Sequence, residues 1–330
     1  MTDGSVFEIA MAYQKTAALT AAVKLDVFSK IATGSTSIDA LASATNAAPR
    51  GLRILCDYLT VMGLLEKQDT SYSLTPEARR FLDRSSPLAM GDCVDFLAAP
   101  EMLTMVLDDP VSYVRRGGAD GVSVIAPDHP VWVRFARAMA PFATLTAKRV
   151  AAHVASSPQP PRTVLDVATG HGLYGIEVAR AVPGASVTAV DWAGVLAIAR
   201  ENAKAAGVDD RYRTIVGSAF DVDWGNGFDL VLLANILHYF DRDTCVALLR
   251  RVRSSLSPTG RILGVEFVPN ADRVSPPVQA AFAFFMLATC PNGDAYTLGD
   301  LDEIARAAGF RGATGRPLAP TTQMLVTFET

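Results

Sequence analysis

The sequence predicts an α/β protein, in which a doubly wound, mostly parallel sheet follows an N-terminal helical part with a winged-helix pattern. Two observations predict this fold class. From residue 163 onward, short β-branched runs alternate with amphipathic segments, which is typical of a parallel sheet covered by helices. Just before this region, residues 156–162 are rich in Pro and Ser and indicate a linker. We therefore expect two domains, at residues 1–155 and 156–330.

The N-terminal domain is predicted to be mostly helical. Within residues 5–33, Leu19, Val23, Val27 and Ile31 recur at every fourth position and form one apolar face. Further helices are expected at residues 37–45, 49–62, 76–82, 87–110 and 131–154, with a hairpin at 64–74 and a loop at 115–121.

Two helices followed by a hairpin form a winged-helix pattern, and many winged helices bind DNA. A DNA reader needs an excess of cations to neutralise phosphates. Residues 35–75 instead carry fewer cations than acids: the cations are Arg50, Arg53 and Lys67, and the acids are Asp39, Asp57, Glu66 and Asp69. This balance favours a structural or dimer-forming module, and a DNA-binding regulator is the alternative.

The composition excludes several classes of partner. The net charge of -4 leaves no basic surface for nucleic acid or an anionic membrane, and no apolar run approaches the ~20 residues of a membrane span. The N-terminus lacks the pattern of a secretory signal. The four cysteines show no C-x-x-C spacing and the four histidines show no metal-ligand spacing. We expect a cytoplasmic protein with reduced thiols and no metal.

The most informative pattern lies between residues 163 and 191. A short buried strand at 164–167 leads into the turn Gly170-His171-Gly172, a helix at 174–182, and a second strand at 186–190 that ends on Asp191. Glycines let the backbone approach a ligand closely, and a helix N-terminus favours a carboxylate or phosphate. Asp191 is placed to accept the hydroxyls of a ribose. This pattern predicts a nucleoside cofactor.

The acid in the first strand discriminates between nucleoside cofactors. Asp166 would repel a pyrophosphate, but it suits the ammonium and sulfonium groups of S-adenosylmethionine. We therefore favour S-adenosylmethionine over a dinucleotide. The remaining alternative is a tight turn that binds nothing.

Two titratable side chains lie at the ends of later strands. His238 follows the strand at 228–233, and Glu266 lies at the end of the strand at 261–267. The carboxyl ends of parallel strands face the ligand crevice, so His238 can take a proton from an acceptor and Glu266 can orient it. The alternatives are a packed histidine and a surface acid. Other strands are expected at 212–216 and 323–329, and helices at 192–207, 244–256, 277–289 and 301–308.

At these motifs the chain resembles the small-molecule O-methyltransferases of the caffeic-acid and bacterial secondary-metabolite type, over almost its whole length. Residues 166–172 resemble the Asp-x-Gly-Gly-Gly-x-Gly loop of that family, Leu237-His238 matches its Leu-His-Asp-Trp segment, and residues 293–297 resemble its Gly-Arg-Glu-Arg-Thr segment. The resemblance implies a class I S-adenosylmethionine-dependent methyltransferase domain with a Rossmann-like fold. It also implies a homodimer whose N-terminal helices help to close the partner's site.

The resemblance and the strand ends together give a set of expected site residues. His238 is the expected base, with Glu266 as one of two acids that flank it. Residues expected to hold the cofactor are Asp166, Ala168, Gly170, Gly172, Asp191, Trp192, Ser218, Ala219, Phe220 and Asn235. Residues expected at the acceptor, in an apolar pocket, are Met139, Phe142, Phe282, Met286 and Asp294.

The sequence also departs from the pattern of the family. Ala168 and Thr169 replace glycines, Ser218 replaces an Asp, and Tyr239-Phe240 replaces Asp-Trp. Ala295 stands where the second flanking Glu belongs, with Asp294 one residue away.

With one acid missing, S- or C-methylation stays open beside transfer to oxygen. A non-catalytic sensor or a cofactor-promoted rearrangement also remains possible from sequence alone. The favoured function is in-line methyl transfer to a small molecule.

Overall fold

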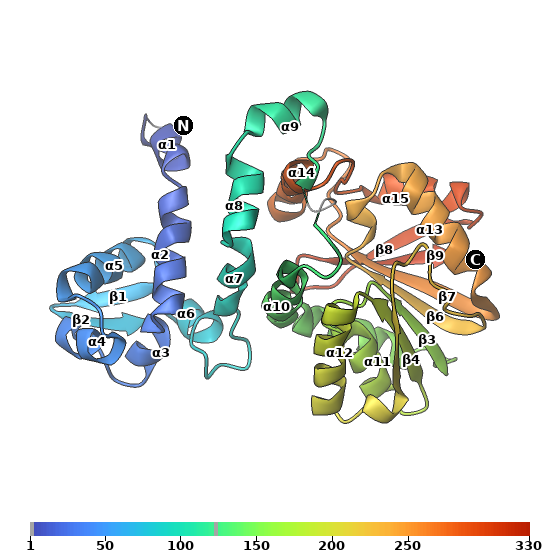
Figure 1. Ribbon diagram of the computed structural model, residues 1–330, viewed down its shortest axis with the longest axis horizontal. Coiled ribbons are helices and arrows are strands. Elements are labelled where there is room, and N and C mark those ends of the chain that lie inside the picture. The colour runs from blue at the N-terminus through green and yellow to red at the C-terminus, as the bar shows by residue number, and fades with distance from the viewer. Residues whose placement is uncertain (1–2, 122–124) are drawn as a thin grey trace. The chain divides into compact units, whose positions relative to one another are not determined.

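The computed structural model describes residues 3–121 and 125–330 (Figure 1). The chain forms two compact units, Met1–Leu103 and Thr104–Thr330. The expected boundary between residues 155 and 156 lies inside the second unit. The helix that precedes it, α10 (Pro130–Ala155), packs against α11 (Leu173–Ala181) and α12 (Ala193–Ala205), so the Pro/Ser segment connects parts of one unit.

The first unit contains the winged-helix pattern that the sequence predicts. Its elements are α1 (Asp3–Ala10), α2 (Tyr13–Lys24), α3 (Val27–Ala32), α4 (Ile38–Thr45), α5 (Pro49–Val61), β1 (Leu65–Gln68), β2 (Ser71–Leu74), α6 (Pro76–Phe81), η1 (Gly91–Cys93) and α7 (Val94–Leu97). The α4 helix begins where the Ser37 side chain accepts a hydrogen bond from the Ala40 N–H, and α5 begins at Pro49. The hydrophobic core of this first unit includes Phe28, Leu41, Leu52, Leu59 and Tyr72.

Two helical predictions for this part of the chain were too long. The expected helix at residues 5–33 is three helices, and Asp26 adopts a left-handed φ of 57° between the last two. The expected helical stretch at 87–110 contains only short helices, ending with α8 (Pro100–Leu107). Both errors have the same cause. When consecutive helices pack on the same core, the apolar pattern continues across the turn between them, and the sequence reads as one long helix.

The cations of the winged-helix segment are largely engaged within the protein. Asp57 accepts hydrogen bonds from Lys67 Nζ at 2.6 Å, Tyr72 Oη at 2.7 Å and Arg53 Nη1 at 3.0 Å. The hydrogen bonds from Lys67 and Tyr72 lower the pKa of Asp57. These contacts tie the hairpin to α5, and they leave a surface unlike the one that DNA phosphates require.

The second unit is built on a seven-stranded sheet with the order β5-β4-β3-β6-β7-β9-β8. Its strands are β3 (Thr163–Val167), β4 (Ser186–Asp191), β5 (Tyr212–Val216), β6 (Phe228–Ala234), β7 (Leu256–Glu266), β8 (Gly312–Pro317) and β9 (Met324–Glu329). The first five strands of that order pair in parallel, while β9 pairs antiparallel with both β7 and β8. The mostly parallel sheet is thus confirmed, and β8 is an edge strand that the sequence analysis missed.

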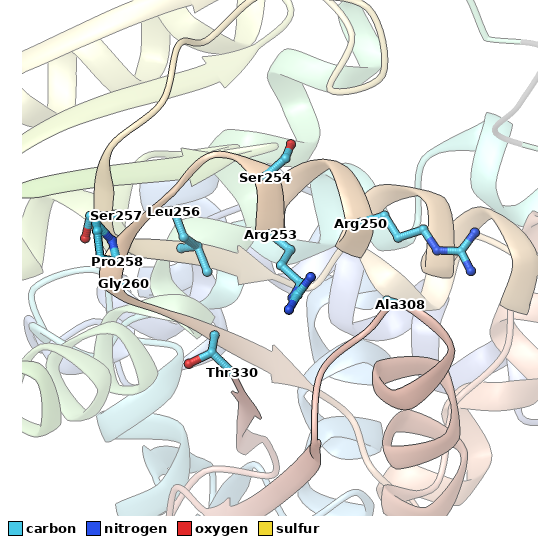
Figure 2. A pocket seen from close by; sticks show the side chains of 9 residues that line it. All are labelled: Arg250, Arg253, Ser254, Leu256, Ser257, Pro258, Gly260, Ala308 and Thr330. Carbon is cyan, nitrogen blue, oxygen red and sulfur yellow. The ribbon is translucent and has the colours of Figure 1, made fainter.

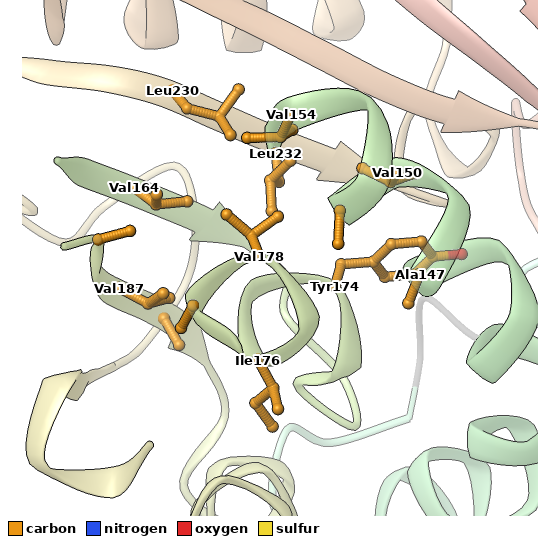
Figure 3. Close-up of a cluster of buried hydrophobic side chains, with 14 of the residues drawn as sticks. Ala147, Val150, Val154, Val164, Tyr174, Ile176, Val178, Val187, Leu230 and Leu232 are labelled. Carbon is orange, nitrogen blue, oxygen red and sulfur yellow. The ribbon is translucent and has the colours of Figure 1, made fainter. Parts of the chain in front are cut away.

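Helices cover both faces of this sheet, as alternating residues along each strand dictate. Val164, Leu230 and Leu232 face α10, α11 and α12 in one core (Figure 3). Leu165 and Leu233 face the other way, toward α13 (Arg242–Ser254) and α15 (Leu298–Ala307). The alternation places Asp166 on the same side as Val164, where α11 lies.

A close backbone contact fixes the end of α14 (Pro277–Thr289). The Ala119 N–H donates to the Cys290 carbonyl at 3.1 Å. A Cβ on Gly118 would lie 2.0 Å from the Pro291 carbonyl oxygen, and one on Gly121 would lie 2.0 Å from that of Thr289. The glycines of the expected loop at 115–121 therefore allow it to lie against α14, although Arg115 and Arg116 belong to α9 (Pro110–Arg116). Among the described residues, no helix is both long and apolar enough to span a bilayer.

Candidate active site

The glycine-rich turn after β3 adopts a conformation that its sequence requires. Ala168, Gly170 and Gly172 all have positive φ, at 53°, 58° and 80°. A Cβ on Gly172 would lie 2.8 Å from Tyr212 Oη, whereas one on Gly170 would meet nothing within 4 Å. Gly172 is thus packed against the protein, and Gly170 borders open space at the N-terminus of α11. This arrangement leaves the backbone beside Gly170 accessible to a ligand.

Asp166 is used inside the protein. It is buried, and its Oδ2 accepts hydrogen bonds from Thr169 Oγ1 at 2.6 Å and from the Gly175 N–H at 3.1 Å. Burial is the main reason that the pKa of Asp166 rises to about 7. These contacts fix the turn on α11. The expectation that this carboxylate also meets the ammonium or sulfonium of a cofactor stays a prediction.

Asp191 ends β4 beside the same turn. Its Oδ2 accepts the Gly170 N–H at 2.8 Å, and its Oδ1 accepts the Trp192 N–H at 2.7 Å. Burial raises the pKa of Asp191 to about 6. The Trp192 side chain is half-buried and packs on the small cluster of Ala136, Val195 and Ile198. The structure therefore brings the ribose candidate and the glycine turn into direct contact.

The segment expected at the adenine follows β5. The Gly217 N–H donates to the Asp191 carbonyl at 3.0 Å, which holds this segment against the end of β4. The Phe220 N–H donates to Ser218 Oγ at 3.1 Å, and the Phe220 ring packs edge-on against Phe240 with centroids 5.2 Å apart. Ala219 packs against the neighbouring core.

A polar network that the sequence analysis missed surrounds Asn235. Asn235 has a φ of 57°, and its Nδ2 donates to Tyr174 Oη at 3.3 Å. Tyr174 Oη donates to Gln323 Oε1 at 3.3 Å, and Gln323 Nε2 donates to Asn235 Oδ1. The three side chains join α11, the end of β6 and the segment before β9. Their wide separation in the sequence left no local signal of this contact.

His238 and Glu266 form a buried pair at the ends of β6 and β7. His238 Nδ1 lies 2.6 Å from Glu266 Oε2. Glu266 Oε1 accepts the N–H groups of Ile236 at 3.1 Å and Leu237 at 2.9 Å. Because the carboxylate accepts these bonds, Nδ1 is assigned as the protonated nitrogen and Nε2 keeps its lone pair. The expected base and its orienting acid are therefore together.

Aromatic rings surround the imidazole. The Phe282 ring of α14 packs edge-on against the His238 ring, with centroids 4.9 Å apart. The Tyr239 ring has its centroid 4.6 Å from that of His238, and both residues belong to one 3-10 turn, η4 (Leu237–Tyr239). The ring centroids of Phe267 and Phe282 are 4.5 Å apart. Such a setting suits a flat, apolar acceptor.

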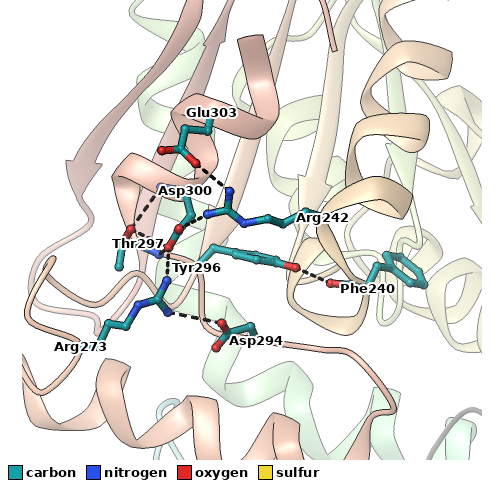
Figure 4. Close-up of polar contacts among 8 residues, drawn as sticks. All are labelled: Phe240, Arg242, Arg273, Asp294, Tyr296, Thr297, Asp300 and Glu303. Atoms are coloured by element: carbon teal, nitrogen blue, oxygen red, sulfur yellow. Dashed lines mark hydrogen bonds and ion pairs between the residues drawn. The ribbon is translucent and has the colours of Figure 1, made fainter. Parts of the chain in front are cut away.

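The segment 293–297 supports His238 through the backbone. The Asp294 N–H donates to the His238 carbonyl at 3.0 Å. Figure 4 shows the second contact, in which Tyr296 Oη donates to the Phe240 carbonyl at 2.6 Å. Ala295 is buried and brings no charge. The Asp294 carboxylate instead pairs with Arg273 at 3.3 Å, so the pair at His238 has a single carboxylate.

The ion pair of Asp294 belongs to a wider network that fixes the same segment. Asp300 accepts from Arg273 at 2.6 Å and also pairs with Arg242, which bonds Glu303 at 2.6 Å (Figure 4). Asp300 completes a capping box with Thr297 at the start of α15. These bonds hold the segment that carries Asp294 and Tyr296.

The other expected acceptor residues lie on two helices. Met286 is buried in α14, four residues after Phe282. Met139 is half-buried and Phe142 is 40% exposed, both on α10. Their place at an acceptor stays a prediction.

A pocket of about 480 Å³ lies far from this pair along β7. Leu256, Ser257, Arg250 and Arg253 contribute to its lining (Figure 2). Leu256 begins β7 and Glu266 ends it, so this pocket lies at the opposite end of the strand from the His238–Glu266 pair. Within the described residues, no group of three or more His, Cys, Asp or Glu side chains could hold a metal ion.

Comparisons with known proteins agree with this arrangement. An O-methyltransferase domain model matches residues 101–311, and an O-methyltransferase dimerisation domain model matches residues 7–84. The 3-hydroxy-5-methyl-1-naphthoate 3-O-methyltransferase of Streptomyces sahachiroi is 30% identical over 92% of this chain and 88% of its own length. The acetylserotonin O-methyltransferase of Mus musculus is 29% identical over 97% of this chain and 87% of its own.

Solved structures show the same architecture over the whole chain. A crystal structure described as a putative O-methyltransferase of Nostoc punctiforme has a TM-score of 0.94 and 42% identity, and the match covers 100% of this chain and 99% of that one. Human N-acetylserotonin methyltransferase in complex with SAM has a TM-score of 0.85 at 20% identity, and the match covers 98% of this chain and 96% of that one.

Proposed function

This chain belongs to the O-methyltransferase family, and on that basis we propose how its residues act. The protein is an S-adenosylmethionine-dependent O-methyltransferase of small molecules. The observation that carries our assignment of the site is the buried His238–Glu266 pair, with Nδ1 and Oε2 2.6 Å apart. This pair ends β6 and β7, and β6 is paired with β3, which leads into the glycine turn.

The residues at the ends of β3 and β4 fit the cofactor. Open space beside Gly170, the N-terminus of α11 and the carboxylate of Asp191 provide a backbone cradle, a positive helix end and a ribose acceptor. S-adenosylmethionine supplies a methyl group on a positively charged sulfur. We assign Gly170 and Asp191 to holding it, with residues 217–220 at the adenine, while Gly172 supports the turn.

His238 then acts on the acceptor. Glu266 holds the Nδ1 proton, so Nε2 can accept the proton of an acceptor hydroxyl as the oxygen forms its bond to the methyl carbon. Glu266 also stabilises the imidazolium that results. Alignment of the acceptor oxygen with the methyl group supplies much of the remaining rate. The phenyl rings near His238 support an aromatic acceptor, and the naphthoate O-methyltransferase relative acts on such a molecule by its name.

The test is to locate the transferred methyl group. The protein would be incubated with methyl-labelled S-adenosylmethionine and a panel of phenols, carboxylic acids, thioethers and activated-carbon acceptors. We expect label on the oxygen of a phenol, found by mass spectrometry and NMR. Label on sulfur or carbon alone would contradict the role of His238 as a base for a hydroxyl.

We also propose that the enzyme works as a homodimer through its N-terminal helices. The dimerisation domain model covers residues 7–84. The first turns of the chain expose large apolar side chains that a second copy would cover: Val6 at 65%, Phe7 at 67%, Ile9 at 72% and Tyr13 at 57%.

Charge placed on this apolar surface should separate the subunits. We expect the wild type to sediment as a dimer and the double variant Phe7→Asp, Ile9→Asp to sediment largely as a monomer, because a buried carboxylate without a partner opposes association. Analytical ultracentrifugation measures this, with the exposed Glu8→Gln as the matched control. A monomeric wild type, or a double variant that stays dimeric, would contradict the proposal.

We also propose a compartment for the enzyme, and the thiols support it. Cys56, Cys93, Cys245 and Cys290 are all free, and structural disulfides are a feature of oxidising compartments, so we place the enzyme in the reducing cytoplasm. Fractionation of native cells tests this placement, and recovery from the medium would contradict it.

A further inference from the structure

Tyr239 has a hydroxyl without a partner beside the proposed base. The second unit has five tyrosines, and in the described part of the chain Tyr239 is the one whose hydroxyl forms no hydrogen bond. The hydroxyls of the other four are bonded. Tyr113 donates to the Val106 carbonyl, Tyr174 donates to Gln323, Tyr296 donates to the Phe240 carbonyl, and Tyr212 shares a hydrogen bond with Thr169. The Tyr239 side chain is half-buried, and its oxygen is not among the fully buried, unpartnered side-chain atoms of the described residues, so a ligand can reach this hydroxyl. A Tyr hydroxyl that bonds to no protein group is available to a ligand.

Tyr239 also lies next to the proposed base. It follows His238 in η4, its ring is half-buried, and its centroid is 4.6 Å from the imidazole. Burial raises the pKa of Tyr239, and the nearby acidic groups of Cys290, Glu266 and Asp191 raise it further. The residue is thus within electrostatic reach of the acids that end β4 and β7. The two strands between them, β3 and β6, lead to the glycine turn and to His238.

We propose that the Tyr239 hydroxyl contacts the acceptor substrate and donates a hydrogen bond to an oxygen next to the hydroxyl that is methylated. This inference rests on the proposed function, because it needs the acceptor hydroxyl to lie at His238 Nε2. An acceptor held there has its adjacent substituent near the Tyr239 ring, 4.6 Å from the imidazole.

The chemistry of the site sets the class of that substituent. The acids around Tyr239 keep its proton in place, so the phenol acts as a donor. Ala295 brings no carboxylate to accept a second substrate hydroxyl, and Asp294 is paired with Arg273. The site therefore favours a phenol that carries an ether or carbonyl oxygen beside its hydroxyl, over one that carries a second donor.

The test compares two phenols of nearly equal shape on protein saturated with S-adenosylhomocysteine. Guaiacol has an ether oxygen beside its hydroxyl, and ortho-ethylphenol has a methylene there. We expect the wild type to bind guaiacol about 5-fold more tightly, the scale of one neutral hydrogen bond, and Tyr239→Phe to bind both equally. Dissociation constants come from NMR titration of protein isotope-labelled at tyrosine Cζ, in which guaiacol should move the Tyr239 signal.

Tyr296→Phe is the matched control. It removes a phenol that bonds to the same backbone turn, at the Phe240 carbonyl, so we expect a lower Tm and an unchanged preference for guaiacol. The same preference in wild type and Tyr239→Phe would overturn the proposal, as would failure of both phenols to bind. A loss of S-adenosylhomocysteine affinity in Tyr239→Phe would also overturn it, because the hydroxyl would then serve the cofactor. The measurement involves no turnover, so its failure is distinguishable from failure of methyl transfer.

Discussion

Replacement of His238 by alanine is expected to slow methyl transfer by ~10²- to 10⁴-fold while the affinity for S-adenosylmethionine stays unchanged. The loss follows from the geometry, because Glu266 holds Nδ1 and leaves Nε2 as the nitrogen that can accept a proton. The cofactor residues are separate, since Gly170 and Asp191 contact each other and not the imidazole.

The fold should survive this substitution with a lower stability. Glu266 Oε1 keeps its hydrogen bonds from the Ile236 and Leu237 N–H groups when the imidazole is removed, but the buried Oε2 loses its partner. We therefore expect a Tm below that of the wild type, with an unchanged affinity for the cofactor. Single-turnover kinetics with the phenol found in the labelling panel would give the rate, and calorimetry with S-adenosylhomocysteine would give the affinity.

The pH dependence separates a lost base from a general disturbance. Without His238, ionisation of the acceptor itself becomes the source of the reactive oxygen, so the rate of the variant should keep rising with pH where the wild-type rate levels off. His153→Gln, a substitution on α10 outside the pair, serves as the control and should keep wild-type rates. An unchanged rate in His238→Ala would remove the base from the mechanism.

Much of this site could be predicted from sequence because of one property of parallel sheets. The carboxyl ends of adjacent strands meet at the same edge, so residues that follow separate strands, such as Asp191, His238 and Glu266, converge. The local glycine pattern likewise predicts the turn at Gly170 and Gly172, because positive φ and close packing leave a recognisable signature.

The parts that could not be predicted depend on contacts between distant or weakly patterned segments. The β8 strand contains Gly312, Gly315 and Pro317 and lies at the sheet edge, so neither propensity nor alternation marks it. The Asn235–Tyr174–Gln323 network joins residues 61 and 88 positions from Asn235. The direction in which the Asp294 carboxylate points depends on Arg273, whose position comes from the fold.

Alanine at Gly172 is expected to destabilise the protein strongly, whereas alanine at Gly170 should leave it folded but weaken cofactor binding. Both glycines have positive φ, so each substitution costs about 1–2 kcal/mol of backbone strain. Only at Gly172 would the new Cβ also overlap packed atoms, at 2.8 Å from Tyr212 Oη and 3.0 Å from Ala199 Cβ. That overlap adds about 1–3 kcal/mol to the loss of unfolding free energy.

The two substitutions thus form a matched pair that separates the structural and ligand-binding roles of the turn. Ala168 already has a φ of 53°, so this turn accommodates an alanine in the left-handed region, and Gly170 has nothing within 4 Å of an added Cβ. The space beside Gly170 is where we place the cofactor, so an added methyl group should lower S-adenosylhomocysteine affinity by about tenfold or more, equivalent to about 1.4 kcal/mol. Calorimetric unfolding and titration would measure both effects. Normal affinity in Gly170→Ala would mean that the cofactor does not approach the backbone at this residue, because the methyl group would then project into space that no ligand needs.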